Sequence, residues 1–378
     1  MSRLKDLIEE LCPHGVEFFP VEGLVLLNNY KQVGANELEK MIVNGGDIPL
    51  LPSSRNYNWF TTKEIAGNFL NNGEVFVMGR ARHANTKYVN GFFVSSNNII
   101  IESNNTKKIT TRFLYHYLTS KVSDFYVETS TYPKFDTNLF KKLLIPVPPL
   151  PVQKEITYIL DTFTELTAEL TAELTAELTL RKKQYEYYRD KLLTFDDVEF
   201  KTLGELVKSQ RGVRVVKSQL SETGKYPVYQ NSMIPLGYYD KFNCPSGTTF
   251  VISAGSAGEI GYCDSKIWAA DDCLYFTCPK NINSRFLYYV LQYNKNYISS
   301  QVRRSSVPRL SRSVIENLKI PIPPLDEQER IVNILDRFDK LCNDLSEGLP
   351  AEIKFRQQQY EYYRDKLLTF DKLNVNFK

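Results

Sequence analysis

The 378-residue sequence lacks the features that mark several common classes of protein. No apolar run approaches the roughly 18 residues that a membrane-spanning helix needs. Residues 1–13 have the spacing of an amphipathic helix, with apolar side chains at Leu4, Leu7, Ile8 and Leu11, and not the pattern of a signal peptide. We therefore expect a cytoplasmic protein of two or three domains with a large hydrophobic core.

Cysteine and histidine are scarce. The 6 cysteines show no C-x-x-C spacing, so we expect reduced and mostly buried thiols. Four of them fall within 244–278, but their spacing is irregular and no histidine lies nearby, which favours core packing over a metal site. The 3 histidines are scattered and suggest neither a zinc-bound water nor a Ser-His-Asp set. These residues are Cys12, Cys244, Cys263, Cys273, Cys278, Cys342, His14, His83 and His116.

Motifs of enzymes that act on DNA or nucleotides are also missing. An adenine methyltransferase needs an N/D-P-P-Y/F motif to hold its target base, whereas residues 147–150 and 322–325 are V-P-P-L and I-P-P-L. Gly255, Gly258 and Gly261 lack the context of a dinucleotide loop and the G-K-[ST] of a triphosphate loop. We interpret these glycines as a hairpin or a close approach of two backbones, and we expect no catalysis by the chain alone.

Proline and glycine are absent from residues 152–195, which permits about 44 helical residues, a rod of roughly 65 Å. This segment contains the word T-A-E-L three times in full, after a partial copy. Ala, Glu and Leu favour helix, and a leucine every four residues forms a ridge that drifts by about 40° per word. We interpret the helix as a spacer between two domains; the alternative is a long helix in an ordinary bundle.

The chain is a tandem duplication. The motif I-P-x-P-P-L at 145–150 recurs 175 residues further on, at 320–325. The 13 residues of 184–196 are identical to those of 359–371. Each half is therefore a variable block followed by a nearly constant helix. We predict four segments, at 1–145, 146–197, 198–319 and 320–378.

The second constant helix differs from the first. It has no T-A-E-L word, and Gly348 and Pro350 interrupt it, so we expect a kink or a break there. Its apolar residues should still pack head to tail on the first helix, which offers the nearest apolar ridge. The expected contacts of the two helices are Leu166, Leu170, Leu174, Leu178, Tyr185, Tyr188, Leu341, Leu345, Tyr360 and Tyr363.

The variable blocks alternate strand-like runs with Gly- and Asn-rich turns, which indicates mixed α/β domains. We expect strands at 75–78, 99–101, 249–252 and 274–277, and short helices at 112–120 and 285–293. Residues 1–145 carry 16 basic and 14 acidic side chains, and residues 199–320 carry 16 and 9, whereas the constant helices are acidic. A basic block suggests a polyanionic partner, and loops that diverge on a shared scaffold suggest two different targets.

These motifs resemble those of a known family. The I-P-x-P-P-L motif with its following glutamine (Gln153 or Gln328), the T-A-E-L words and the Q-Y-x-Y-Y-R-D-K-L-L-x-F ending are similar to the specificity (S) subunit of type I restriction–modification systems. The repeats resemble those of its IC subgroup. The resemblance implies an α+β fold: two tandem α/β target recognition domains, separated by two long antiparallel, coiled-coil-like helices with pseudo-two-fold symmetry.

The same resemblance implies a function without catalysis. Each recognition domain would read one half of a split double-stranded DNA site, and the number of repeats would affect the gap between the halves. The constant helices would dock two methyltransferase (M) subunits, to which restriction (R) subunits attach, in a bacterial cytoplasm. S-adenosylmethionine would belong to the M subunit, ATP and Mg²⁺ to the R subunit, and no cofactor to this chain. From the residues alone, the alternative is an interaction scaffold that binds protein or another polyanion.

Loops that mix Arg with amide or aromatic side chains are the candidate DNA contacts. Arginine reads guanine with two parallel hydrogen bonds, and Asn or Gln reads adenine in the same way. The matched Pro and basic residue in 131–134 and 305–309 suggest a shared phosphate-contacting loop. For each residue the alternative is a solvated surface charge. The predicted contacts are Arg55, Asn56, Tyr57, Asn58, Arg80, Arg82, His83, Asn85, Tyr132, Lys134, Arg211, Arg214, Gln230, Asn231, Arg303, Arg304 and Arg309.

Overall fold

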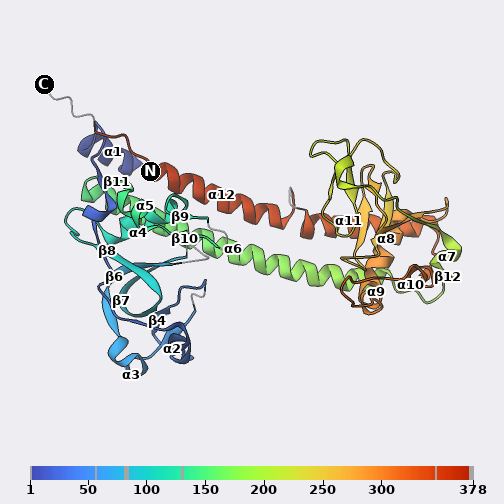
Figure 1. The fold of residues 1–378 in the computed structure, drawn as a ribbon, viewed down its shortest axis with the longest axis horizontal. Coiled ribbons are helices and arrows are strands. Elements are labelled where there is room, and N and C mark those ends of the chain that lie inside the picture. The colour runs from blue at the N-terminus through green and yellow to red at the C-terminus, as the bar shows by residue number, and fades with distance from the viewer. Residues whose placement is uncertain (1, 56–57, 81–84, 129–131, 345–346, 374–378) are drawn as a thin grey trace. The chain divides into compact units, whose positions relative to one another are not determined.

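The computed structural model of the chain describes residues 2–55, 58–80, 85–128, 132–344 and 347–373. It contains two compact units (Figure 1): unit 1 comprises Met1–Thr171 and Phe355–Lys378, and unit 2 comprises Ala172–Lys354. Both units mix helices and strands, as the sequence predicts. The longest helix, α6 (Leu150–Leu192), begins in unit 1 and ends in unit 2. In the described part of the chain, no helix is both long and apolar enough to cross a membrane.

Unit 1 is built on a seven-stranded sheet of order β2-β8-β6-β7-β4-β5, with β3 also paired to β7. Successive side chains of a strand point to opposite faces, so β6 contributes Phe76 and Met78 to the core under α4, and Val75 and Val77 to a second core on the other face. The elements are α1 (Ser2–Leu11), β1 (Phe18–Pro20), β2 (Val25–Leu27), β3 (Gln32–Val33), α2 (Ala35–Lys40), β4 (Ile48–Leu51), β5 (Phe60–Thr61), α3 (Lys63–Ala66), β6 (Asn71–Gly79), β7 (Thr86–Ser96), β8 (Asn98–Ser103), α4 (Thr111–Ser120), β9 (Tyr126–Val127), β10 (Lys134–Phe135), α5 (Thr137–Lys142) and β11 (Leu144–Pro146).

Unit 2 has a four-stranded sheet of order β13-β19-β16-β17 and a three-stranded sheet of order β15-β14-β18. α8 covers the first sheet through Phe286, Leu287 and Val290, and a cluster around Phe250 packs toward Tyr229 and the second sheet. The elements are β12 (Phe200–Thr202), α7 (Leu203–Leu206), β13 (Lys208–Arg211), β14 (Tyr226–Tyr229), β15 (Gly237–Tyr239), β16 (Thr248–Ile252), β17 (Ile260–Cys263), β18 (Trp268–Ala269), β19 (Cys273–Thr277), α8 (Ser284–Tyr293), α9 (Lys295–Ser300), α10 (Arg312–Glu316), β20 (Lys319–Pro321) and α11 (Leu325–Asn343). The last helix, α12 (Leu349–Leu367), begins in unit 2, and most of it belongs to unit 1.

The local patterns in the variable blocks form the expected elements. The four predicted strands lie within β6, β8, β16 and β19, and the two predicted short helices are α4 and α8. Gly255 and Gly258 lie in the β16–β17 hairpin with φ values of 80° and 90°, and a Cβ on Gly255 would lie 2.6 Å from the main-chain oxygen of Asn231. The glycines therefore form the hairpin and the close backbone approach that we predicted. All six cysteines are free, and five are buried, as expected.

The duplicated motif forms the same connection between variable block and constant helix in both units, a strand pair followed by a buried glutamine, which we call the joint. β1 pairs antiparallel with β11 in unit 1, and β12 pairs antiparallel with β20 in unit 2. The glutamine after each motif is fully buried. Gln153 accepts a hydrogen bond from the Thr110 N–H (2.9 Å) and donates to the carbonyl oxygens of Lys108 (2.9 Å) and Pro148 (2.8 Å). Gln328 makes the equivalent three bonds, with Asn283, Asn281 and Pro323.

We expect Gln153→Ala to lower the free energy of unfolding of unit 1 by about 2–4 kcal/mol, because it removes three hydrogen bonds and leaves buried main-chain groups without partners. Thermal unfolding of the chain measures the loss, and Gln358→Ala, at an exposed position of α12, is the control. Equal unfolding temperatures for the two variants would show that the buried amide does not hold the joint.

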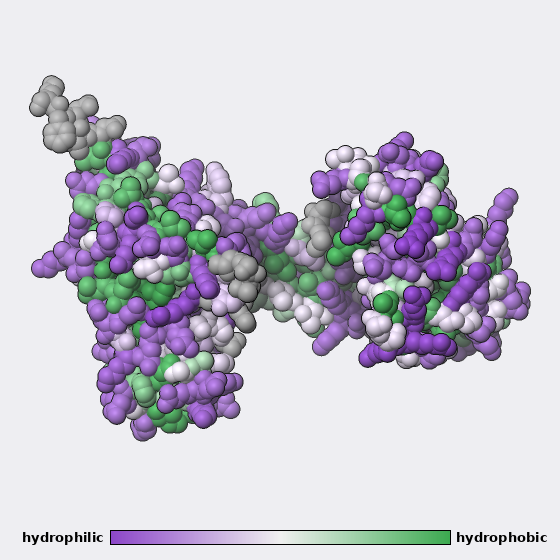
Figure 2. All heavy atoms as spheres, in the orientation of Figure 1, coloured by the Kyte–Doolittle hydropathy of each residue, from purple (hydrophilic) through white to green (hydrophobic). Residues whose placement is uncertain are grey.

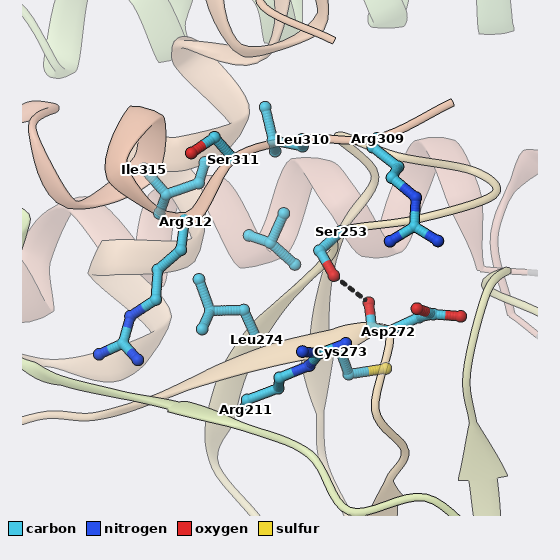
Figure 3. A pocket seen from close by; sticks show the side chains of 11 residues that line it. Arg211, Ser253, Asp272, Cys273, Leu274, Arg309, Leu310, Ser311, Arg312 and Ile315 are labelled. Atoms are coloured by element: carbon cyan, nitrogen blue, oxygen red, sulfur yellow. Dashed lines mark hydrogen bonds between the residues drawn. The ribbon is translucent and has the colours of Figure 1, made fainter. Parts of the chain in front are cut away.

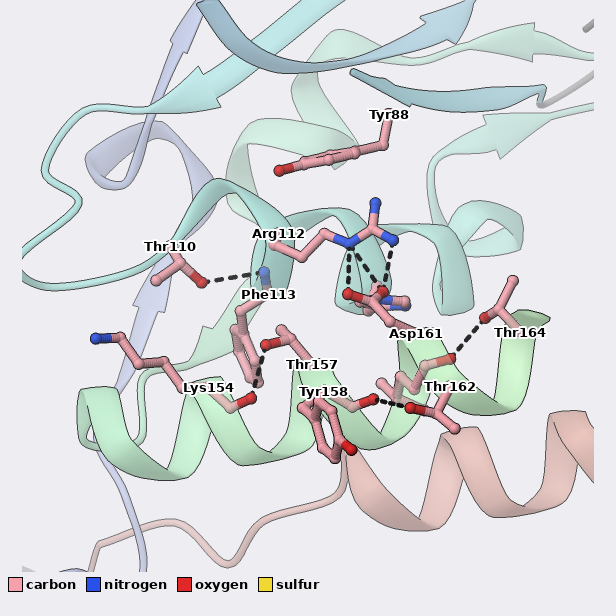
Figure 4. A network of polar contacts seen from close by, with 12 residues as sticks. Tyr88, Thr110, Arg112, Phe113, Lys154, Thr157, Tyr158, Asp161, Thr162 and Thr164 are labelled. Carbon is pink, nitrogen blue, oxygen red and sulfur yellow. Dashed lines mark hydrogen bonds and ion pairs between the residues drawn. The ribbon is translucent and has the colours of Figure 1, made fainter. Parts of the chain in front are cut away.

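A second duplicated contact ties each variable block to its constant helix (Figure 4). Arg112 of α4 donates through Nε to Asp161 of α6 at 2.8 Å, and its guanidinium lies 4.0 Å from the ring centroid of Tyr88. Arg285 of α8 makes the equivalent contacts, with Asp336 at 2.7 Å and with the ring centroid of Tyr262 at 4.6 Å. The planar guanidinium thus pairs with a carboxylate on one side and an aromatic face on the other.

The two arginine contacts differ in one neighbour. In unit 1, His116 Nε2 lies 2.7 Å from Asp161 Oδ1, whereas in unit 2 the hydroxyl of Tyr289 donates to Asp336. Burial lowers the pKa of His116 in spite of this hydrogen bond, so the imidazole is neutral at pH 7. Burial alone would raise the pKa of Asp161, but the hydrogen bonds from His116 and Arg112 leave it below its ordinary value. The ion pair of unit 1 is therefore Arg112 with Asp161.

The repeat region of α6 buries three of the four leucines of the predicted ridge, and the fourth, Leu166, lines a groove beside Tyr360 and Tyr363 of α12. The helix spans 43 residues, and Leu170, Leu174 and Leu178 are half-buried, but Leu166 is 55% exposed. Phe163 and Thr167 are half-buried instead. The half-buried positions thus move from Leu170 to Thr167 and Phe163 toward the start of the repeat, as the drift of about 40° per word predicts.

Within each unit, α6 has a helical partner. In unit 1, the ring centroids of Phe163 and Tyr363 of α12 lie 6.3 Å apart, and Thr164 Oγ1 lies 2.9 Å from the Tyr360 hydroxyl, so the two helices are antiparallel there. In unit 2, the ring of Tyr188 stacks on Phe338 of α11, with centroids 5.7 Å apart. Among the other predicted contacts, Tyr185 is half-buried, Leu341 is 37% exposed, and Leu345 lies outside the described residues.

The expected interruption of the second constant helix is confirmed. α11 ends at Asn343, and α12 begins at Leu349. The Gly348 N–H donates to the carbonyl oxygen of Asp344 at 3.1 Å, and a Cβ on Gly348 would lie 2.6 Å from the Lys340 oxygen. Only glycine fits where the chain passes this close to the end of α11. The second helix is therefore two helices and not one long rod.

The segment after α12 returns to the start of the first variable block. The Val16 N–H donates to the Asp371 oxygen (2.9 Å), and the Leu373 N–H donates to the Val16 oxygen (2.9 Å). Gly15 permits this approach, because a Cβ there would lie 2.4 Å from the Asp371 oxygen. The two segments are thus joined by main-chain hydrogen bonds.

Candidate nucleic-acid interface

In unit 1, several predicted contacts lie together beyond the end of the β6–β7 hairpin. Arg80 is exposed directly after β6, and its carbonyl oxygen accepts a hydrogen bond from the Phe135 N–H (3.3 Å), which brings the exposed Lys134 beside it. The Gly79 N–H donates to the Asn85 oxygen (3.1 Å), and the Asn85 amide donates to the Ser54 oxygen. These bonds bring the exposed Arg55 to the same end of the sheet.

The other predicted residues of this block have different surroundings. Asn58 is exposed, and Tyr132 is half-buried with the Lys134 ammonium 5.5 Å from its ring centroid. Asn85 is buried, and its amide faces the loop before Arg55. Asn56, Tyr57, Arg82 and His83 lie outside the described residues.

Unit 2 repeats this arrangement with different side chains. The Leu310 N–H donates to the Ser253 oxygen just after β16 (2.8 Å), as Phe135 does to Arg80 after β6. This bond puts the exposed Arg309 in the place that Lys134 has in unit 1. Arg303 and Arg309 exchange two main-chain hydrogen bonds, of 2.9 and 3.1 Å, and the Ser256 N–H donates to the Asn231 oxygen (2.8 Å). Asn231, Arg303 and Arg309 therefore surround one hairpin end.

A cleft of about 340 Å³ opens beside this hairpin end (Figure 3). Arg211 and Arg309, both predicted contacts, line it together with Asp272, and apolar side chains such as Leu274 form its floor. Arg211 Nε donates to the Asp271 carbonyl oxygen (2.7 Å), and Gln230 Nε2 lies 3.5 Å from the Asp271 carboxylate. Ser253 Oγ donates to the Asp272 oxygen (2.9 Å). Arg214 and Arg304 are exposed but do not line the cleft.

The cleft is lined by one more arginine than we predicted. Hydrophilic residues cover most of the visible face of unit 2 in Figure 2. Arg312, which we did not single out, adds a third guanidinium to the cleft; it donates to Glu316 (2.8 Å) and to the Ser209 oxygen (3.1 Å). The sequence offered one sign of this role, because Arg312 follows the predicted contact Arg309 by three residues. The cleft can hold a polar or anionic group at its edge against an apolar floor.

The comparison with known protein families decides the identity. The profile of the type I restriction modification DNA specificity domain matches the chain twice, at residues 13–180 and 196–355. The chain belongs to the family of type I restriction–modification specificity subunits. This confirms the resemblance that we drew from the I-P-x-P-P-L motif and the constant helices. The specificity subunit has two target recognition domains, with the long helix α6 between them.

Relatives and solved structures agree with this assignment. A putative type I restriction enzyme specificity subunit of Haemophilus influenzae is 36% identical over 302 residues, which cover 73% of this specificity subunit and 76% of the relative. A type I restriction enzyme specificity subunit of Escherichia coli is 32% identical over 358 residues, covering 86% and 87%. The crystal structure of the S subunit from M. genitalium has a TM-score of 0.60 at 18% identity, covering 94% and 96%, and thus shares the fold.

Proposed function

We propose that this specificity subunit reads a split double-stranded DNA site, with one recognition domain for each half. The supporting observation is the equivalent position of Lys134 and Arg309. Both side chains are exposed. The residue after Lys134 donates its N–H to the Arg80 oxygen just after β6, and the residue after Arg309 donates its N–H to the Ser253 oxygen just after β16. A basic residue shared by both domains suits a phosphate, whereas the side chains that differ around it suit different bases.

The constant helices supply the second part of the proposal, the docking of two methyltransferase subunits. The identical runs 184–196 and 359–371 present the same aromatic side chain twice, with Tyr187 61% and Tyr362 62% exposed. One surface presented twice suits two copies of one partner. Restriction subunits then attach through the methyltransferase subunits. The chain itself contributes specificity and no catalysis, so S-adenosylmethionine, ATP and Mg²⁺ belong to the partners.

An exchange of residues 18–145 for the first block of another family member is expected to change one half of the methylated motif and leave the other half intact. The reason is that each domain carries its own basic cluster and its own Gln and Arg joints to the helix. Methylome sequencing of cells that contain the chimera and the methyltransferase subunit measures the motif. The exchange of residues 198–319 is the matched control, which should change the other half.

A change in both halves of the motif would contradict independent reading. If the protein is instead a scaffold for another polyanion, the chimera would not change the motif, and the assembled complex would not discriminate between DNA sequences. The proposed DNA contacts also predict a steep loss of affinity for duplex DNA as salt rises, because each neutralised phosphate releases counterions.

A further inference from the structure

In unit 1, the chain that leaves β4 is held by a row of buried side chains. The carbonyl oxygen of Leu51 accepts from Asn98 Nδ2 (2.7 Å), and the oxygen of Pro52 accepts from Lys87 Nζ. The oxygen of Ser54 accepts from Lys87 Nζ (2.7 Å) and from the Asn85 amide. Three main-chain oxygens within four residues thus meet three side-chain donors from β7, β8 and the residues between β6 and β7.

These donors are buried far more than their residue types usually are. Asn98 is fully buried, Lys87 is 5% exposed, and Asn85 is 7% exposed. Lys87 pairs with Val77 across the β6–β7 ladder, on the face that carries the second core of unit 1. Taking an ammonium group out of water costs free energy, so its place here requires compensation. Its hydrogen bonds to Pro52 and Ser54 supply part of that compensation.

We infer that Asn85, Lys87 and Asn98 form a cradle that positions residues 52–55, and with them Arg55, for reading the first half-site. This inference rests on the proposed function, because it takes the first recognition domain to be a DNA reader. Lys87 is a positioning residue: it holds the backbone that presents Arg55, and it is itself too buried to meet a base. A rigid backbone under a reading side chain sharpens discrimination between bases.

The second recognition domain provides an internal control. Tyr88 and Tyr262 occupy equivalent positions, since each stacks on the arginine that pairs with a constant helix. The residue before Tyr262 is Gly261, so the second domain has no lysine at the position of Lys87. An effect that depends on Lys87 should therefore appear at the first half-site and be absent from the second.

Proton loss offers a way to test the cradle without any substitution. Burial lowers the pKa of Lys87 to about 8. Among the described residues, the other charged or titratable groups on this side of the sheet are Arg55, Arg80 beside Asn98, and Tyr30, whose hydroxyl donates to Glu102 (2.7 Å). Burial and the Glu102 contact raise the pKa of Tyr30 to about 12. A rise from pH 7 to pH 9 therefore passes through the pKa of Lys87 and stays below that of Tyr30.

A rise in pH should change base discrimination and folding stability in opposite directions. Above pH 8 the ammonium becomes an amine and donates more weakly to Pro52 and Ser54, so discrimination at the first half-site should fall. In the unfolded chain the lysine keeps its proton up to its ordinary pKa. The unfolded state then binds more protons than the folded state, and the contribution of Lys87 to stability rises with pH in this window. Lost discrimination is therefore not a sign of unfolding.

The experiment uses the chain assembled with its methyltransferase subunit and measures the affinity ratio between the correct duplex and duplexes with one wrong base pair in either half-site. We expect Lys87→Met to lower the ratio at the first half-site about tenfold, in the range of one lost base contact, and to leave the second ratio unchanged. Lys87→Arg, which keeps donors that do not titrate, should retain the ratio. Lys107→Met, at an exposed position of the same domain, is the control.

Raising the pH from 7 to 9 should lower the affinity ratio at the first half-site for the wild type and leave this ratio unchanged for Lys87→Arg. This comparison tests the cradle even if Lys87→Met fails to fold. An unchanged first ratio in folded Lys87→Met, or equal losses at both half-sites, would overturn the cradle and leave the proposed function standing. A wild-type complex that discriminates at neither half-site would overturn the proposed function, and the cradle with it.

Discussion

Deletion of one T-A-E-L word, residues 171–174, is expected to shorten the gap between the half-sites by one base pair and to leave both half-sites unchanged. Four residues contribute about 6 Å to the length of α6 and about 400° of turn, so their loss rotates one end of the helix against the other by about 40°. B-DNA turns by about 34–36° per base pair, given 10–10.5 pairs per turn. The rotation therefore matches one base pair.

The shortening matches less well, since about 6 Å is nearer two base pairs of rise. Rotation should decide the outcome, because a recognition loop on the wrong side of the duplex makes no base contact, whereas DNA bends at modest cost over a few ångströms. The deletion spares the contacts of Phe163 in unit 1 and of Tyr188 in unit 2, which lie on either side of it. The break between α11 and α12 offers the second helix a place to adjust.

Methylome sequencing of an active deletion variant measures the gap. The matched control replaces residues 171–174 with four alanines, which keeps the length and the helix, so the gap should stay as it is. A deletion variant that methylates the original motif would show that the repeat region does not set the gap.

Substitution of both Tyr187 and Tyr362 by alanine is expected to abolish assembly with the methyltransferase subunits while the chain stays folded. Both side chains are more than half exposed, so their loss removes little intramolecular packing. An exposed aromatic residue at the centre of an interface often contributes about 2 kcal/mol or more, which is roughly 30-fold in affinity at each site. Each single variant should lose one of the two partner copies.

Native mass spectrometry of the complex counts the bound methyltransferase subunits. Tyr158→Ala is the control, because Tyr158 is 69% exposed on α6 but lies outside the identical run. If the double variant still binds two copies, the duplicated tyrosines are not the docking surface, and the identical runs serve the packing of the helices alone.

Much of the fold follows from patterns within short stretches of sequence. The absence of Pro and Gly predicted α6, and Gly348 with Pro350 predicted the break after α11. The recurrence of I-P-x-P-P-L predicted two halves that each consist of a variable block and a constant helix. The sequence showed that Gln153 recurs as Gln328, but it did not show that both side chains are buried and hydrogen-bonded to the main chain. Local propensity and repetition are sufficient for such features, because each depends on neighbours in the chain.

The features that sequence reasoning missed depend on contacts between distant residues. The cradle needs Lys87 to meet an oxygen 35 residues earlier, and an inward lysine in an alternating strand gave no sign of that partner. Arg211 and Arg309 line one cleft because β13 and β16 both pair with β19, and no local pattern specifies this pairing. The predicted DNA contacts themselves remain predictions.

The hydrogen bonds between Val16 and the segment around Asp371 have a consequence for the order of the chain. In the second half, a continuous peptide leads from the constant helix through Asp196 to Val198 and into the variable block. In the first half, Asp371 and Val16 make that same passage through hydrogen bonds in place of a peptide. Within unit 1, these two hydrogen bonds therefore stand where the second half has a covalent link between constant helix and variable block. A linker that joins these two segments covalently should leave the contacts of unit 1 in place, because their main chains already meet.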